Sequence, residues 1–201
     1  MSDSAGSSDR AFVRAEGFLE RFEQTAVKNR TRVATSAPLE NLQAAALGHP
    51  DAFMRRRCLD FLDHYASDES ATVFARALTD PVEPVRSVAL HSIACERCRV
   101  GELCVSDVVP QLIKVLSGDP SVGMRHKAIP ALLQLSVRDD RARQAVERAA
   151  REDSDELIRS VAEQALRGTH VRARKTYERS QKRSQRALPT PGGTGSKVWR
   201  G

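Results

Sequence analysis

Three of the four cysteines in the chain lie within one stretch of eleven residues, 94–104, which reads ACERCRVGELC. His91 precedes Cys95 by four residues, Cys98 follows Cys95 by three, and Cys104 comes six residues later. Histidine nitrogen and cysteine thiolate are the ligands of structural zinc sites, and C-x2-C is the spacing that lets two thiolates reach one ion. His91, Cys95, Cys98 and Cys104 are therefore candidate ligands of one zinc ion.

Two other interpretations of this stretch stay open. Cysteine is a small hydrophobic side chain that is often buried, so Cys95 and Cys104 could pack between helices while Cys98 faces solvent. A disulfide or redox switch is the third interpretation, but the polar N-terminal sequence MSDSAGSSDR has no apolar signal segment. We therefore expect a cytoplasmic chain, in which structural disulfides are disfavoured. The stretch also lacks the second C-x2-C pair of a strong zinc motif.

The elements that position these residues follow from an internal repeat. Four segments align without gaps and read PDAFMRRRCLDFL, PVEPVRSVALHSI, PSVGMRHKAIPAL and SDELIRSVAEQAL, starting at Pro50, Pro81, Pro120 and Ser154. Apolar residues recur in each segment at intervals of four, which is one face of a helix. The aligned positions are Met54, Val85, Met124 and Ile158, then Cys58, Ala89, Ala128 and Ala162, then Leu62, Ile93, Leu132 and Leu166. Cys58 stands where the other segments have alanine, so we expect it in the core.

Charged residues also repeat in these segments. An arginine follows the first aligned apolar position in each of them: Arg55, Arg86, Arg125 and Arg159. An aspartate precedes three of the four starts (Asp80, Asp119 and Asp153), and His49 breaks the pattern in the first. Asp followed by Pro suits a helix N-terminus, because the carboxylate caps it and proline needs no backbone partner. We expect the arginines to line up along the stack, each near an aspartate of a neighbouring turn, as a structural ladder.

A second amphipathic stretch lies upstream of each segment, so each unit is a helix, a short turn and another helix. These stretches read LENLQAAALG, ATVFARALT, VVPQLIKVLSG and ARQAVERAAR. With the DPxxxVRxxA-type signature, seen best from Asp80 to Ala89, the pattern resembles the HEAT repeat family, including its short bacterial form, over about residues 37–168. The resemblance implies an all-α solenoid of about four HEAT-like helical hairpins, with the second helix of each hairpin lining a concave face.

Two further segments flank the repeats. Residues 1–10 are polar and expected to be disordered, whereas residues 11–33 place Phe12, Leu19 and Phe22 on one helical face. We expect this helix to cap the first hairpin, with a protein-binding amphipathic helix as the alternative. No apolar run approaches the roughly 20 residues of a membrane-spanning helix. The solenoid with its capping helix is thus predicted over residues 11–168.

The positive charge of the chain is concentrated in residues 169–201. The whole chain carries +6, and these residues contain nine Lys/Arg and one Glu, so residues 1–168 carry −2. We expect a basic, largely disordered tail, although residues 169–187 could extend as a helix. A basic arm can bind nucleic acid or an acidic protein surface, or it can simply be solvated. Its candidate contact residues are Arg172, Arg174, Lys175, Arg179, Lys182, Arg183 and Arg186.

The predicted function is that of a non-catalytic adaptor or scaffold that binds a protein partner through the concave face and the basic tail. Candidate contact residues on the polar side of the second helices are Arg57, Asp60, Ser87, His91, Lys127, Gln134 and Glu163. The sequence shows no phosphate-binding loop and no nucleophile–base pair, so we expect neither an enzyme nor a cofactor beyond the zinc. Nucleic-acid binding through the tail is the second interpretation. The resemblance supplies the third, an enzyme, since HEAT-like solenoids occur among bilin lyases and alkylpurine DNA glycosylases.

Overall fold

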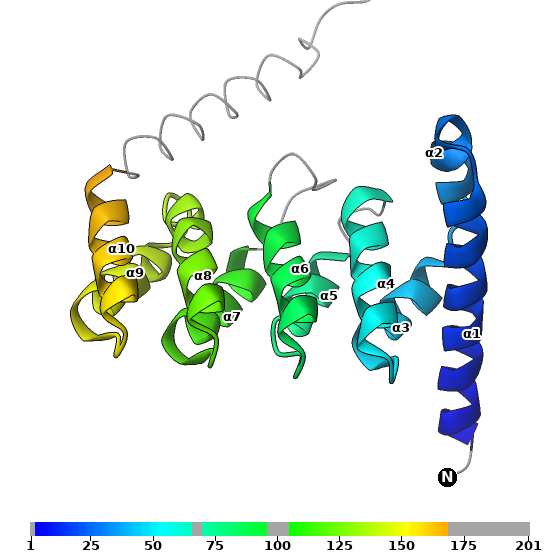
Figure 1. The fold of residues 1–201 in the computed structure, drawn as a ribbon, viewed down its shortest axis with the longest axis horizontal. Coiled ribbons are helices and arrows are strands. Elements are labelled where there is room, and N and C mark those ends of the chain that lie inside the picture. The colour runs from blue at the N-terminus through cyan, green and yellow to red at the C-terminus, as the bar shows by residue number, and fades with distance from the viewer. Residues whose placement is uncertain (1–2, 66–69, 96–104, 169–201) are drawn as a thin grey trace, which may run out of the picture.

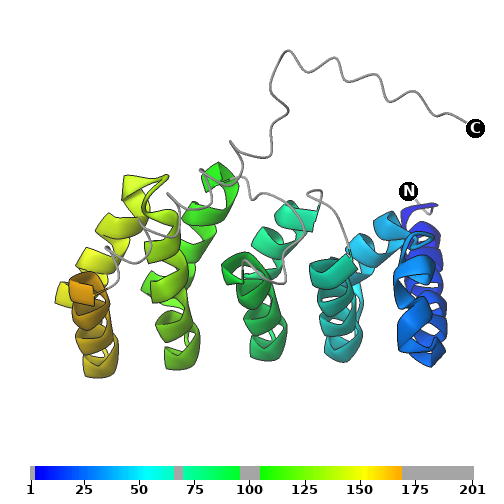
Figure 2. The ribbon, with the colours of Figure 1, turned by 90° about the horizontal axis from the view of Figure 1, so that it is seen from above.

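The computed structural model describes residues 3–65, 70–95 and 105–168, and these residues form helices joined by turns (Figure 1). Four helical hairpins follow one another along the chain. They are α3 (Leu39–Gly48) with α4 (Ala52–Tyr65), α5 (Ala71–Ala77) with α6 (Glu83–Ala94), α7 (Val105–Gly118) with α8 (Val122–Leu135), and α9 (Asp140–Glu152) with α10 (Glu156–Gly168). The first helices of the hairpins form one row and the second helices another (Figure 2). The predicted all-α solenoid is confirmed.

The aligned apolar positions of the repeat form the core. At the middle position Cys58, Ala89, Ala128 and Ala162 are all 0% exposed, and their small side chains permit close approach of neighbouring helices. Cys58 is therefore a core residue, as predicted. Burial raises the pKa of its thiol to about 12, so the thiol stays protonated and unreactive at neutral pH.

Each arginine of the first three hairpins binds the hairpin that follows it. Its Nε and Nη2 atoms donate to the two carboxylate oxygens of one aspartate. The pairs, with their two N–O distances, are Arg55–Asp80 (2.6 and 2.9 Å), Arg86–Asp119 (2.8 and 2.9 Å) and Arg125–Asp153 (3.2 and 3.2 Å). Bidentate charged hydrogen bonds of this kind are the strong class. The predicted ladder is confirmed for three of the four arginines, and each aspartate comes from the turn between the two helices of the next hairpin.

The aspartates of the ladder also fix the backbone of their own turns. Oδ1 of Asp80 accepts the N–H of Val82 at 2.8 Å, and Oδ1 of Asp119 accepts the N–H of Ser121 at 2.9 Å. These aspartates are not the helix N-cap residues that the sequence suggested, because Val82 and Ser121 occupy that place. The Asp-Pro pair instead forms the tight turn that precedes the helix.

In the first hairpin His49 occupies the position of the ladder aspartate and accepts the same backbone hydrogen bond. Its Nδ1 accepts the N–H of Asp51 at 3.0 Å, two residues on, as the ladder aspartates do. Because Nδ1 is an acceptor, the proton of the neutral ring lies on Nε2, which donates to Oε1 of Glu16 at 2.8 Å. The break in the sequence pattern is therefore a substitution that joins the first hairpin to the N-terminal helix.

That N-terminal helix, α1 (Asp3–Gln24), packs on α3 and α4 and closes the end of the stack. Phe18 and Phe22 are buried, and their rings meet Phe61 of α4 edge to face at centroid distances of 5.1 and 4.9 Å. The capping role is confirmed. The same aromatic cluster includes Tyr65, whose ring lies 5.0 Å from that of Phe22.

The bounds of α1 differ from the expected 11–33. The helix starts at Asp3, within the ten residues expected to be disordered, and ends at Gln24. Beyond this end the side chain of Arg30 folds back and donates to the carbonyl oxygens of Thr25 and Glu23, each at 3.3 Å, which satisfies carbonyl groups near the helix end. A short η1 (Val27–Asn29) and α2 (Arg30–Ala34) follow. None of the helices in the described part of the chain combines the length and apolar character needed to cross a membrane.

Stability should fall in acid partly because of Asp80. Burial raises the pKa of this carboxyl, but the hydrogen bonds from Arg55 and from the Val82 N–H outweigh burial, so the pKa lies below its ordinary value of 3.8. A carboxyl whose pKa is lower in the folded state stabilises the fold above its unfolded pKa, and this contribution is lost as pH falls through the folded pKa. The free energy of unfolding of Asp80→Asn should therefore depend less on pH below about 4 than that of the wild type. The free energy of unfolding is measured by denaturant titration at several pH values, and an equal change with pH in the two proteins would contradict the prediction.

Candidate partner-binding face

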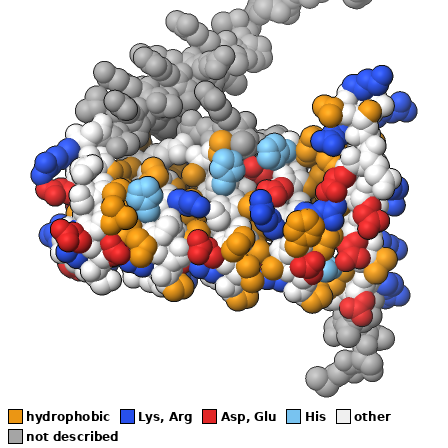
Figure 3. Space-filling model, viewed as in Figure 1, with side chains coloured by type: hydrophobic (Ala, Val, Ile, Leu, Met, Phe, Trp, Pro, Cys, Tyr) orange, Lys and Arg blue, Asp and Glu red, His pale blue; other side chains and the backbone are white. Residues whose placement is uncertain are grey.

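The exposed sides of α4, α6, α8 and α10 form one surface, here called the second-helix face. Acidic, basic, histidine and apolar side chains are mixed across it (Figure 3). All seven solenoid residues predicted to contact a partner belong to these helices: Arg57 and Asp60 to α4, Ser87 and His91 to α6, Lys127 and Gln134 to α8, and Glu163 to α10. The structure thus places them along one row, although their role in binding remains a prediction.

Several of these side chains are held by contacts between helices. Nζ of Lys127 on α8 donates to Oγ of Ser87 on α6 at 2.8 Å. Nε of Arg57 donates to Oε1 of Glu23 on α1 at 2.9 Å, and its guanidinium carbon lies 5.6 Å from the centre of the Phe53 ring. Arg57 is therefore partly committed to holding α1, whereas exposed Lys127 keeps donor capacity for a partner.

The carboxyl group of Asp60 on this face has a shifted pKa. Burial raises the pKa of its carboxyl, and the neighbouring Asp63 adds to the effect, while Arg56, His64 and His91 act in the opposite direction. The net shift is upward. The carboxylate lies near Arg56 and His64 of its own helix and His91 of α6, which makes this part of the face a polar surface suited to recognition.

Two large apolar side chains near this face were not selected from the sequence. Phe53 is 63% exposed and Leu157 is 57% exposed, and both occupy the repeat position just before the first aligned core residue. The sequence did indicate them, since an apolar pair stands near the start of each of these two helices. Only the second residue of each pair belongs to the repeated apolar positions of the core, so the first is left for the surface. Exposed apolar side chains beside polar ones are typical of protein-binding surfaces.

Pro130 marks a further feature of α8. Proline has no N–H, so it cannot donate to the carbonyl of His126, four residues before it. Pro130 and His126 are both exposed. A carbonyl released in this way is an acceptor that a partner could use, and the sequence indicated it only by the proline inside a helical pattern.

The predicted zinc site lies partly outside the described residues. His91 is exposed and Cys95 half-buried at the end of α6, and the N–H of Cys95 donates to the carbonyl of His91 at 2.8 Å, so the two residues are one turn apart. Cys98 and Cys104 lie outside the described residues, as do the tail residues Arg172, Arg174, Lys175, Arg179, Lys182, Arg183 and Arg186. Within residues 3–65, 70–95 and 105–168 no three potential ligands gather in one place. Zinc binding stays a prediction.

Metal analysis tests the zinc prediction directly. Protein purified without chelator should contain about one zinc per chain, as one closed site requires, and Cys98→Ser should remove it. Cys58→Ala is the matched control, because Cys58 is a core residue and alanine is the residue at that position in the other hairpins. Metal-free wild-type protein, or equal zinc in the Cys98→Ser variant, would contradict the site.

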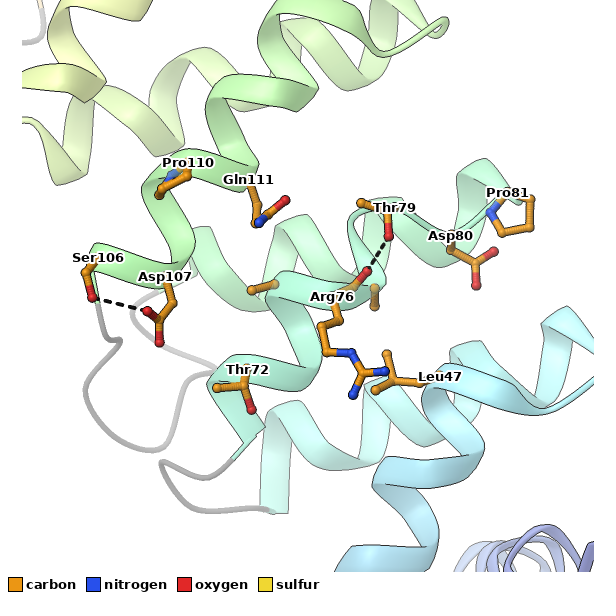
Figure 4. Close-up of a pocket in the computed structure, with 12 residues that line it drawn as sticks. Leu47, Thr72, Arg76, Thr79, Asp80, Pro81, Ser106, Asp107, Pro110 and Gln111 are labelled. Carbon is orange, nitrogen blue, oxygen red and sulfur yellow. Dashed lines mark hydrogen bonds between the residues drawn. The ribbon is translucent and has the colours of Figure 1, made fainter. Parts of the chain in front are cut away.

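A groove of about 720 Å³ lies on the first-helix side of the stack, lined by residues of α3, α5 and α7 and by the turn after α5. Figure 4 shows the Arg76 side chain reaching from α5 toward Leu47 of α3, with Asp107 on the α7 side. α5 has seven residues against fourteen in α7, which leaves room in this row. The described lining residues include the hydroxyl groups of Thr72 and Ser106 and the carboxylates of Asp80 and Asp107, so the groove offers polar contacts.

Comparison with known proteins connects this architecture to a family. The family model described as HEAT repeats matches residues 99–167, which contain α7, α8, α9 and nearly all of α10. A search of curated proteins finds no match for the chain. The earlier hairpins share the register of the matched ones, because the same arginine and aspartate positions form the ladder through the whole stack.

Proposed function

Since this chain is a HEAT-repeat solenoid, we propose that it is a non-catalytic adaptor whose second-helix face binds a protein partner. HEAT repeats generally act as scaffolds for protein interactions. The observation that carries the proposal is the continuity of this face over four hairpins, with contacts such as Lys127–Ser87 holding side chains between neighbouring helices. A partner that follows the row would meet several helices at once.

The mixed chemistry of the face supports a protein as the partner. Phe53 and Asp60 on α4 and Lys127 on α8 offer an exposed apolar contact, an anion and a cation along the same row of helices. Protein interfaces combine apolar anchors with a polar rim, whereas a nucleic-acid surface needs a continuous excess of positive charge. Residues 1–168 carry −2, so such an excess exists only in residues 169–201.

Nucleic-acid binding by residues 169–201 is the second candidate function, favoured by their nine Lys/Arg and one Glu. Its signature would be an affinity that falls steeply with salt and is lost when the chain is cut after Gly168. Binding of the protein partner by the second-helix face should survive the same cut in large part.

Charge reversal on the two sides of the stack tests the proposed face. Lys127→Glu should weaken capture of the partner from source-cell lysate about tenfold, equivalent to about 1.4 kcal/mol. Arg148→Glu, on α9 in the other row, is the matched control, because it makes the same change in charge at an exposed helical residue. Equal capture by wild type and Lys127→Glu would contradict the proposal, and loss of capture only in Arg76→Glu would move the site to the groove.

A further inference from the structure

The arginine of the last hairpin makes only part of the contacts made by the three before it. Nη1 of Arg159 donates to the carbonyl oxygens of Asp153 and Ser154 at 2.7 and 3.2 Å. Arg55 and Arg86 make the same pair of contacts to their own turns, at 2.7 and 3.1 Å and at 2.8 and 3.2 Å. The guanidinium of Arg159 is therefore held in the ladder orientation, and within the described residues its Nε and Nη2 have no carboxylate.

The last hairpin carries charged residues at repeat positions that are apolar in the third hairpin. Val109, Ile129 and Leu133 of the third hairpin are buried, and the positions 34 residues later, at the same repeat offset, hold Arg143, Glu163 and Arg167. These charges pair within their own helices: Arg143 donates to Glu147 at 2.8 Å, and Arg167 pairs with Glu163. The end of the stack thus fits a solvated terminal hairpin, and a further apolar hairpin would not match it.

We propose that Arg159 is the docking point for an acidic turn of a protein partner. The expected ligand is an aspartate carboxylate that takes both Nε and Nη2, as Asp80, Asp119 and Asp153 do at the three internal junctions. A planar guanidinium fork selects a carboxylate by this geometry. Arg159 lies on α10 near the turn that follows α9, and its test uses a peptide and does not depend on capture through Lys127, so the two proposals can fail separately.

Neither the chain's own tail nor a second copy is the fitting occupant. Residues 169–201 carry nine Lys/Arg against one Glu, so they are repelled by another cation. A second copy has no ladder carboxylate to offer, because Asp80, Asp119 and Asp153 are each bound by an arginine of their own chain. At its N-terminal end, α1 covers the first hairpin.

The test uses the full chain and an acetylated, amidated peptide with the sequence GDPSVGM, which copies residues 118–124 and carries one acidic turn. Nε–H signals of the arginines are followed by NMR, and Arg159→Lys identifies the Arg159 signal by its loss. The peptide should shift this signal saturably, and the variant peptide GNPSVGM should bind at least about tenfold more weakly, because the amide cannot replace the carboxylate.

Three results would overturn the proposal. The first is equal binding of the two peptides, and the second is an equal shift at the exposed Arg148. The third is that Arg159 is already bound in the free chain. A change of its signal with protein concentration would indicate binding by a second copy, and a change on cutting the chain after Gly168 would indicate binding by residues 169–201. Arg159→Lys should keep the positive charge yet lose the peptide binding, because an ammonium has no planar fork.

Discussion

Arg86→Met should lower the free energy of unfolding by about 3–5 kcal/mol, the cost of leaving one partner of a buried ion pair without the other. Arg86 and Asp119 are 9% and 4% exposed at their side chains, and both carboxylate oxygens of Asp119 accept from the guanidinium. Removing the arginine also frees the carbonyl of Asp80, which Nη1 binds at 2.8 Å. Equilibrium unfolding in denaturant measures the loss.

Two variants decide whether this loss comes from the buried charge. Arg56→Met removes an exposed partner of Asp60, at 51% and 50% exposure, and should cost less than about 1 kcal/mol. The double variant Arg86→Met/Asp119→Leu should recover much of the loss, because an apolar pair has no charge to desolvate. A cost below about 1 kcal/mol for Arg86→Met would mean that the ladder is not a main source of stability.

Ala128→Leu should lower the free energy of unfolding by about 1–3 kcal/mol through overpacking. Ala128 is 0% exposed on α8, which packs against α6 and α10, and the added carbon atoms have no space between these helices. Ala89→Leu should behave in the same way on α6. Ala44→Leu is the matched control, because Ala44 is exposed on α3. Unchanged unfolding midpoints for both buried variants would show that the repeat register is wrong.

The stack could be read from the sequence because its interactions repeat. Each ladder pair uses an arginine and an aspartate at fixed positions of the repeat, so the copies in register predicted that an arginine lies near an aspartate of a neighbouring turn, as Arg86 does with Asp119, and that Cys58 is buried. The repeat did not predict the role of His49. Its partner Glu16 lies 33 residues away on a helix outside the repeat, and no periodic pattern connects the two.

The residue at which α1 ends was not predicted correctly for a similar reason. The apolar spacing continues to Ala26, which is exposed, and the helix has already ended at Gln24. Arg30 donates to two carbonyl groups near this end, those of Thr25 and Glu23, and the sequence shows only a charged residue at that position. Contacts at a helix end depend on how the chain turns after it, and the spacing of apolar residues does not predict that turn.

The candidate face was located by the sequence, but its pairings were not. The polar side of each second helix follows from the core spacing, which placed Lys127 and Ser87 on the same face. Their hydrogen bond, and the contact of Arg57 with Glu23 of α1, depend on the stacking of neighbouring helices. The paired residues are 40 and 34 positions apart in the sequence. Which polar side chains of the face are already hydrogen-bonded within the chain could therefore be seen only in the structure.

Site-specific photo-crosslinking shows directly whether the second-helix face binds the partner. A benzophenone amino acid is placed at position 127 on α8 or at position 148 on α9, both exposed. The full chain is then irradiated with the lysate from which the partner is captured. We expect a crosslink to the partner from position 127 and none from position 148. A crosslink from position 148 alone would contradict it.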